Sequence, residues 1–181
     1  MRAPSLHDLS VYDALRASAL RTPAKLALVS AGTSYRYAEL LAQAPAPLST
    51  WLHPARDENT RFAASLTHRE LMLRVLELAV RTRAFSRDTD SAVAIAADTD
   101  TTLCVVALLA PLVVGGTVRR LNHAEAVAAI AAGTVNQAWL ESIEALAPPL
   151  PASFRHALIV GDIPAARLDA LFGAERWSRA A

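Results

Sequence analysis

The sequence predicts an α/β fold in which a mainly parallel sheet is flanked by helices. Short apolar runs alternate with helical patterns, the connections between them are short, and glycine, proline and capping residues fall at the segment ends. Hydrophobic residues make up 53% of the 181 residues, so one globular unit with a buried core is expected.

The first 44 residues are predicted to form a helix, a strand and a second helix. Ser10 and Asp13 have the spacing of a capping box, which indicates a helix over Val11–Arg21. An apolar run at Leu26–Ser30, bounded by proline and glycine, predicts a strand. A helix over residues 37–43 follows. Its start is weakened by about 1 kcal/mol, because the side chain of Arg36 cannot accept hydrogen bonds from the first N–H groups of the helix.

Residues 45–60 are predicted to be a linker or loop, and they are the best candidate boundary in the chain. Pro45, Pro47 and Pro54 disfavour a continuous helix or strand there. Residues 61–181 are expected to form an α/β subdomain that packs with residues 1–44 as one unit.

A second capping box, from Thr67 to Glu70, predicts a helix that reaches about Thr82. One face of this helix is apolar, with Leu71, Val75, Leu78 and Ala79 at helical spacing. We therefore expect it to pack against the sheet.

The same alternation continues to the end of the chain. Strands are expected over residues 91–97, 118–121, 135–138 and 157–160. Helices are expected over 101–110, from the cap at Asn122 to Gly133, over 139–147 and over 164–172, where Gly173 closes the last one.

One segment, residues 101–118, carries no charge and reaches the lower edge of the length of a membrane span. Pro111 and the pair Gly115 and Gly116 divide it, so we predict a buried helix, a turn and a strand instead. No membrane span is expected, and because no secretory signal opens the sequence, a cytoplasmic location is expected.

Composition excludes several function classes. A net charge of +1 predicts no general attraction to nucleic acid. Cys104 is the only cysteine, so no internal disulfide is possible, and its apolar surroundings favour a core thiol over a nucleophile. The five histidines have no metal-binding spacing, and no metal site is predicted.

Five short blocks occur in a recognisable order, at residues 11–28, 35–40, 67–69, 111–118 and 158–164. Together the blocks resemble the adenylate-forming superfamily, which comprises acyl-CoA synthetases and adenylation domains of nonribosomal peptide synthetases. The resemblance implies a partial version of that superfamily's N-terminal domain.

The phosphate-binding loop of that superfamily is missing from the sequence. Residues 55–65 contain no glycine and no lysine, and the position of the family's loop lysine is taken by Phe62. Such a loop needs glycines that turn backbone N–H groups toward the phosphates, and a lysine to meet their charge. Thr67 and His68 resemble the end of that loop, but Thr67 is explained more simply as the helix cap.

The resemblance also implies a substrate site formed by Asp98, Asp100, Gly161 and Asp162. Asp98 and Asp100 follow a predicted strand where the family's acyl pocket begins, and Gly161 and Asp162 follow another. The alternative is that these aspartates cap the helices that come after them. No catalytic residue is assigned.

Three functions remain open. The first is a degenerate synthetase-like protein that forms no acyl-adenylate alone and acts as a binding or partner module in acyl or carrier-protein metabolism. The second is one subunit of a split ligase that activates a carboxylic acid with ATP and Mg²⁺ and then makes a thioester. The third is a structural relic. A carrier protein, a complementary ligase subunit or a second copy are the expected partners, and no cofactor is expected outside the ligase alternative.

Overall fold

The structure is a computed structural model that describes residues 10–43, 61–62, 66–85, 92–96 and 102–179. Its main feature is a seven-stranded sheet with the order β2-β1-β6-β5-β7-β8-β9. All neighbouring strands are parallel except β1 and β2. The strands are β1 (Leu26–Ser30), β2 (Thr33–Arg36), β5 (Ala92–Ala96), β6 (Thr117–Arg120), β7 (Gln137–Leu140), β8 (His156–Ile159) and β9 (Trp177–Arg179). The predicted α/β class with a mainly parallel sheet is confirmed.

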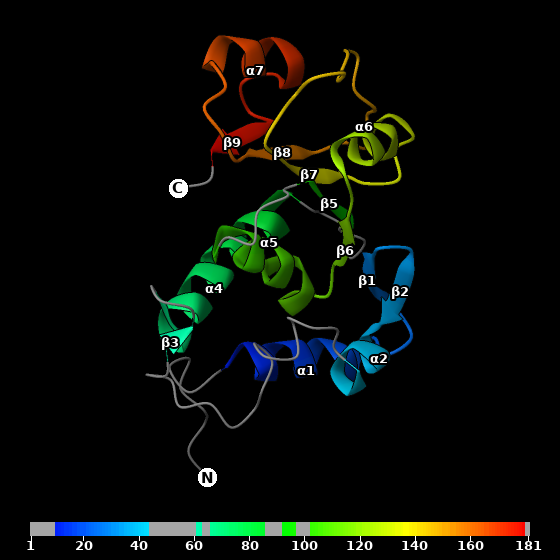
Figure 1. Cartoon of the computed structure of the whole chain (residues 1–181), viewed down its shortest axis with the longest axis vertical. Coiled ribbons are helices and arrows are strands. Elements are labelled where there is room, and N and C mark those ends of the chain that lie inside the picture. Colours follow the sequence, from blue (N-terminus) through cyan, green and yellow to red (C-terminus); the bar gives the residue numbers. More distant parts are fainter. Residues whose placement is uncertain (1–9, 44–60, 63–65, 86–91, 97–101, 180–181) are drawn as a thin grey trace.

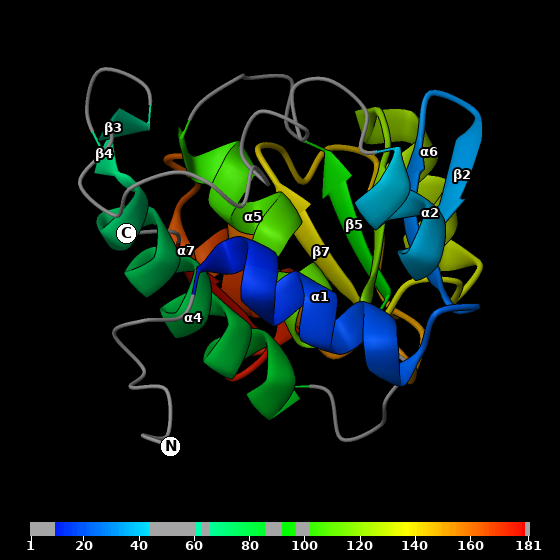
Figure 2. The same ribbon diagram turned by 90° about the horizontal axis from the view of Figure 1, so that it is seen from below.

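Helices cover both faces of the sheet (Figure 1). On one face lie α1 (Val11–Arg21), α4 (His68–Phe85) and α5 (Thr102–Val113), and on the other lie α6 (His123–Ala131) and α7 (Ala165–Phe172). The short helix α2 (Tyr37–Ala42) follows β2. Both α1 and α4 pack against α5, and α1 runs across it (Figure 2).

Alternate strand residues supply the two cores of the molecule. In β7 and β8, Trp139 and Leu158 belong to the cluster under α1, α4 and α5, whereas Ala138 and Ala157 belong to the cluster under α6 and α7. Successive side chains of a strand point to opposite faces, so this division follows from the strand geometry. The interior strand β7 is buried along its whole length, as expected for a parallel sheet covered on both sides.

Three side chains surround the C-terminal end of α5 and bind its last carbonyl groups. The Ser18 hydroxyl donates to the Val113 carbonyl oxygen at 2.8 Å, and the Lys25 ammonium donates to that of Gly115 at 2.7 Å. The buried Tyr37 hydroxyl lies 2.9 Å from the Leu112 carbonyl oxygen and 2.7 Å from that of Gly116. The end of the helix is therefore held by residues from α1, α2 and the segment before β1.

That end has the geometry of a Schellman motif. The Gly116 N–H donates to the Pro111 carbonyl oxygen at 2.8 Å and the Gly115 N–H to that of Leu112 at 3.1 Å, with Gly115 at φ 88°. The prediction that α5 ends at Ala110 was wrong, because the helix continues through Pro111. A proline in the last turn removes one N–H bond, and the burial of Leu112 together with the satisfied helix end offsets that loss.

Most other elements match the sequence-based expectations within a few residues. Helix α1 has its predicted bounds and its predicted capping box, and α6 is capped by Asn122 and Glu125 as expected. At the start of α2 only one half of a capping box forms. The Arg36 backbone N–H donates to the Glu39 carboxylate at 2.7 Å, but the arginine side chain has no acceptor for a helical N–H.

The helix predicted over residues 139–147 was wrong. Trp139 and Leu140 complete β7, where their backbones pair with β5 on one side and β8 on the other. Residues after Leu140 form turns, one of which has the Leu146 N–H bonded to the Ile143 carbonyl oxygen at 3.2 Å. Burial in the sheet has outweighed the local preference for a helix. The strands β2 and β9 were not expected from the sequence.

The segment before α4 forms a small hairpin. Strand β3 (Arg61–Phe62) pairs antiparallel with β4 (Leu66–Thr67), and Phe62 is opposite Leu66. The predicted linker at residues 45–60 lies outside the described residues. Segment 1–44 contributes β1 and β2 to the main sheet, where β1 pairs with β6.

Candidate functional site

The first candidate site is the carboxyl edge of the parallel strands. Strand β5 has β6 on one side and β7 on the other: the chain passes from β5 through α5 to β6, and then from β6 through α6 to β7 on the opposite side of β5. Ligands of open α/β sheets bind outside the carboxyl ends of the strands at such a point. The loop that follows β5 carries Asp98 and Asp100, and both lie outside the described residues.

The loop that follows β8 reaches the same edge and contains Gly161 and Asp162. A Cβ atom on Gly161 would lie 3.1 Å from the carbonyl oxygen of Glu141, which follows β7. This close approach explains the glycine by packing alone. The Asp162 carboxylate is fully exposed and lies 3.5 Å from the Arg179 guanidinium.

The interpretation of Asp162 as a helix cap was wrong. The N-cap residue of α7 is Pro164, and no side chain caps this helix end. Because Asp162 lies two residues before the cap, its carboxylate stands clear of the first helical N–H groups. It therefore remains an acidic side chain at the carboxyl edge.

Arg179 holds this loop, a role that sequence reasoning missed. Its guanidinium donates to the carbonyl oxygen of Gly161 at 3.2 Å and to that of Ile163 at 2.6 Å. The contacts join β9 to the loop across 18 and 16 residues of sequence. No local motif could have signalled them, because β9 itself was not predicted.

The cap at Thr67 is confirmed. The Glu70 N–H donates to the Thr67 hydroxyl oxygen at 3.2 Å, and the Thr67 N–H donates to the Glu70 carboxylate at 2.7 Å. The side chain of His68 lies outside the described residues. Thr67 thus has a structural role that involves no nucleotide.

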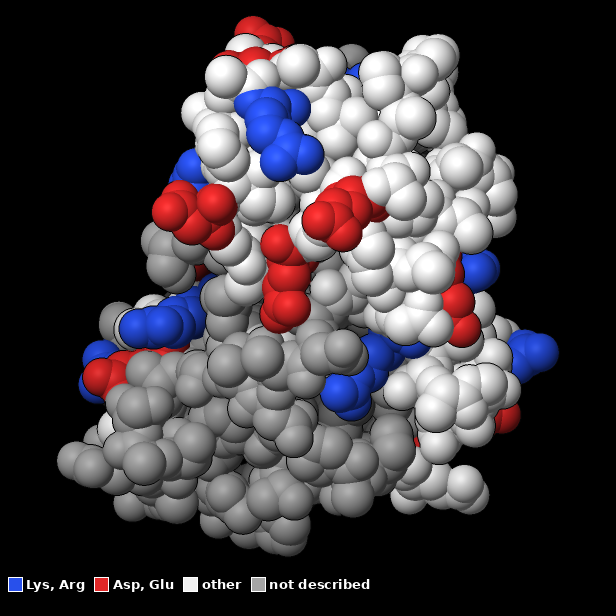
Figure 3. Space-filling view, turned by 45° about the horizontal axis from the view of Figure 1, so that its top comes forward, with Lys and Arg blue, Asp and Glu red and all other residues white. Residues whose placement is uncertain are grey.

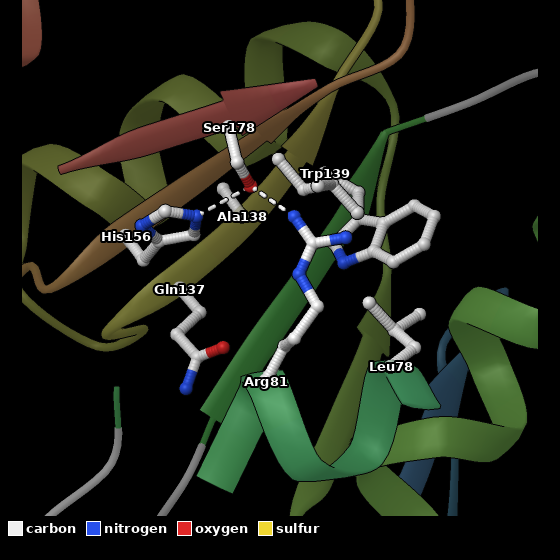
Figure 4. A pocket seen from close by; sticks show the side chains of 8 residues that line it. Leu78, Arg81, Gln137, Ala138, Trp139, His156 and Ser178 are labelled. Carbon is white, nitrogen blue, oxygen red and sulfur yellow. Dashed lines mark hydrogen bonds between the residues drawn. The ribbon is translucent and has the colours of Figure 1, made fainter. Parts of the chain in front are cut away.

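A second candidate site is a small pocket between α4 and the sheet (Figure 4). The hydroxyl oxygen of Ser178 lies at its centre, 2.9 Å from the Arg81 guanidinium, which donates to it, and 2.8 Å from His156 Nε2. The serine oxygen can accept from both groups or donate to His156, so the direction of its bond with Nε2 depends on the tautomer of the ring. The pocket is also lined by Leu78, Gln137, Ala138, Trp139 and Leu158.

His156 is kept neutral in this pocket. The side chain is 5% exposed. Burial lowers its pKa from 6.5 to about 4, and the positive charge of Arg81 acts in the same direction.

The serine and histidine do not form a working nucleophile and base. An imidazole with a pKa of about 4 is a weak base at neutral pH. The cavity volume is about 10 Å³, which holds about one water molecule and no organic substrate. The pocket is therefore suited to a very small ligand and not to acyl transfer.

The charged side chains visible on one face form no large patch of a single sign. Figure 3 shows acidic and basic side chains in separate small groups on the described part of one face. Within the described ranges, no three His, Cys, Asp or Glu residues are grouped so that they could hold a metal ion. No helix in this part of the chain is long and apolar enough to cross a membrane.

Comparison with known proteins identifies the fold and not a family. No family model and no curated protein matches the sequence. Among solved structures, the chain is similar to the N-terminal subdomain of NpsA from Klebsiella oxytoca in complex with 3-hydroxyanthranilyl-AMSN, with a TM-score of 0.59, 12% identity, and coverage of 94% of this chain and 71% of that one. The chain therefore has the fold that the sequence resemblance implied.

Two longer proteins are matched over a smaller share of their length. A putative long-chain-fatty-acid CoA ligase from Rhodopseudomonas palustris CGA009 matches with a TM-score of 0.47 and 18% identity over 88% of this chain and 35% of that one. NpsA-ThdA, an artificially fused adenylation-PCP di-domain from Klebsiella oxytoca, matches with a TM-score of 0.40 and 14% identity over 84% and 22%. The chain thus spans about a third or less of these two proteins.

Proposed function

We propose that this protein is a binding or partner module that uses the fold of an adenylation-type N-terminal subdomain and forms no acyl-adenylate on its own. The observation that carries the proposal is the sequence of residues 55–65, which lacks glycine and lysine in a chain with this fold. Retention of the fold without the phosphate-gripping residues favours binding over adenylation.

The chemistry of nucleotide binding supports this reading. Attack on an α-phosphate depends on positioned cations and backbone donors. Phe62 stands where a lysine is needed, and its backbone is paired with Leu66 in the hairpin. Asp57 and Glu58 would repel a triphosphate. We propose that neither ATP nor Mg²⁺ is a cofactor of this chain alone.

The proposed ligand is a carboxylic acid or its thioester on a carrier protein, bound at the carboxyl edge of the sheet. In the described part of that edge, Arg179 holds the loop of residues 161–163 by two hydrogen bonds, and the Gly161 backbone leaves no room for a side chain beside the Glu141 carbonyl oxygen. A fixed loop at the carboxyl edge is a suitable wall for a ligand.

Isothermal titration tests the proposal directly. The titrants are ATP with Mg²⁺, an acyl-adenylate analogue, a fatty acid, an aryl acid and an acylated carrier protein. A measurable heat of binding with an acid or with the acylated carrier protein, and none with ATP, supports the binding module. Tight binding of ATP or of the analogue, or pyrophosphate exchange that depends on a carboxylic acid, would overturn it in favour of a ligase subunit.

A pair of variants locates the binding site. Arg179→Met removes the contacts that hold residues 161–163, and we expect it to weaken acid or carrier-protein binding several-fold. Arg167→Met removes an exposed arginine from α7, for which no side-chain contact is seen in the described structure, and should leave binding unchanged. Equal affinities for both variants would place the ligand elsewhere.

A second copy of this chain is the remaining candidate partner. The sheet ends in two edge strands, β2 and β9, and the side chains of Leu73 and Val80 on α4 are 57% and 69% exposed. Unpaired strand edges and exposed apolar side chains both favour association. Light scattering measures it, and a stable monomer at high concentration would leave only a different protein as the partner.

A further inference from the structure

Arg81 is a partly buried cation that has no anionic partner in the described part of the chain. Its guanidinium donates to the neutral hydroxyl of Ser178 at 2.9 Å, and no carboxylate lies within ion-pair distance among the described residues. A charge removed from water is costly unless an opposite charge or strong hydrogen bonds replace the lost solvation. One hydroxyl provides little of that compensation.

Among the described residues that line the pocket, Arg81 carries a positive charge and no side chain carries a negative one. His156 is neutral and the Ser178 hydroxyl carries no charge, so neither side chain offsets the guanidinium. The side chains of Leu78 and Trp139 form an apolar wall beside it (Figure 4). Low polarity on one side strengthens the field that Arg81 produces inside the hollow.

The size and the charge of the pocket together define what fits. The cavity volume is about 10 Å³, close to the space of one water molecule. A phosphate or a nucleotide is too large, whereas a halide ion or the end of a single carboxylate group is of the right size. The remaining N–H groups of the guanidinium are the donors that such an anion needs.

We propose that the pocket formed by Arg81, Ser178 and Trp139 is a binding site for one small monovalent anion. The anion neutralises Arg81 and ties α4 to β9, and is supplied either as a free halide or as a carboxylate group. Gln137 and His156 are the first residues of β7 and β8, so part of the pocket lining lies at the amino ends of these strands and not at the carboxyl edge. The proposal therefore does not depend on the function proposed above.

Thermal unfolding with added salt tests the site. Sodium chloride and sodium acetate are titrated to about 0.2 M against the unmodified protein, Arg81→Gln and Arg74→Gln. Arg74 is exposed on the same helix, so this variant reports general effects of salt and of charge loss. We expect the midpoints of the unmodified protein and of Arg74→Gln to rise by about 3 °C, and that of Arg81→Gln to stay unchanged.

The two salts distinguish the sources of the anion. If both salts raise the unfolding midpoint, the pocket accepts any small monovalent anion. If acetate alone raises it, the pocket accepts a carboxylate group. Equal responses of Arg81→Gln and the unmodified protein to both salts would overturn the proposal.

Iodide quenching of tryptophan fluorescence provides a second measurement that does not depend on stability. Trp139 lines the pocket, so iodide bound beside Arg81 should quench it at saturable, low concentrations, and chloride should compete. Trp139→Phe identifies this component among the three tryptophans. Ser178→Ala retains the charge and should retain saturable quenching. Linear, non-competitive quenching in the unmodified protein would rule out a bound anion.

Discussion

Replacement of Tyr37 by phenylalanine removes one hydroxyl group from the C-terminal end of α5. The side chain is fully buried, and its oxygen lies 2.9 Å from the Leu112 carbonyl oxygen and 2.7 Å from that of Gly116. The Leu112 oxygen keeps its bond from the Gly115 N–H at 3.1 Å. The Gly116 carbonyl loses its hydroxyl donor in a place that water does not reach.

The structure allows an estimate of the cost. A buried hydrogen bond contributes about 1 kcal/mol, and a buried acceptor left without its donor costs about 1–3 kcal/mol. We therefore expect Tyr37→Phe to lower the free energy of unfolding by about 2 kcal/mol, measured by urea denaturation with far-UV circular dichroism. The matched control is Tyr35→Phe, since the hydroxyl of this partly buried tyrosine makes no hydrogen bond with the described residues; its effect should stay within about 0.5 kcal/mol.

The same substitution should change the response to alkaline pH. Burial raises the pKa of Tyr37 above its ordinary value of 10.0. In the unfolded chain the phenol loses its proton near that value while the folded protein retains it, so stability falls as pH rises above about 10. Tyr37→Phe should lack this part of the alkaline loss. Unfolding free energies and alkaline profiles identical to those of the unmodified protein would refute the assigned role of the hydroxyl.

Three further substitutions test other buried or linking contacts. Because burial lowers the pKa of His156 from 6.5 to about 4, the folded state binds fewer protons than the unfolded chain, and stability should fall as pH drops from about 6.5 toward 4. His156→Gln should flatten this loss in urea denaturation curves recorded across that pH range. Arg119 Nε is buried without a hydrogen-bond partner in the described structure, so Arg119→Met should unfold at the same or a higher urea concentration, and a marked decrease would show that the guanidinium is stabilising. Arg179→Met should speed hydrogen exchange in residues 161–163 while the global unfolding midpoint stays nearly constant; unchanged exchange would mean that the loop is held by other contacts.

Local signals in the sequence were sufficient for the elements that have clear ends. Ser10 and Asn122 each begin a helix as capping residues, and Gly133 and Gly173 end helices with positive φ angles of 66° and 80°. In these places the backbone groups at the helix ends are satisfied by residues only a few positions away, so a single sequence contains the information.

Local sequence signals failed where contacts between distant segments decide the secondary structure. Trp139 lies in a strand because β5 and β8 pair with it on both sides, and neither partner is near it in sequence. Pro111 remains helical because Ser18 and Tyr37 complete the end of α5 from 95 and 75 residues away. Burial and long-range pairing therefore outweighed local propensity at both positions.

The candidate sites show the same limit. Gly161 and Asp162 could be placed at the carboxyl edge from the order of strands, but the loop that holds them depends on Arg179 in an unpredicted strand. The pocket of Arg81 joins residues 97 positions apart in the sequence. Periodicity and motifs report on neighbours, and neither signals a contact of that range.

Strand β9 is three residues long, yet its alternating side chains serve opposite faces of the sheet. Ser178 points to the pocket under α4, and the next residue, Arg179, holds the loop beyond β8. Any chain that competes for the edge of β8 would have to displace this strand, and both contacts would be released together. Strand exchange at this edge would thus act on the anion pocket and on the loop of the proposed ligand site in a single step.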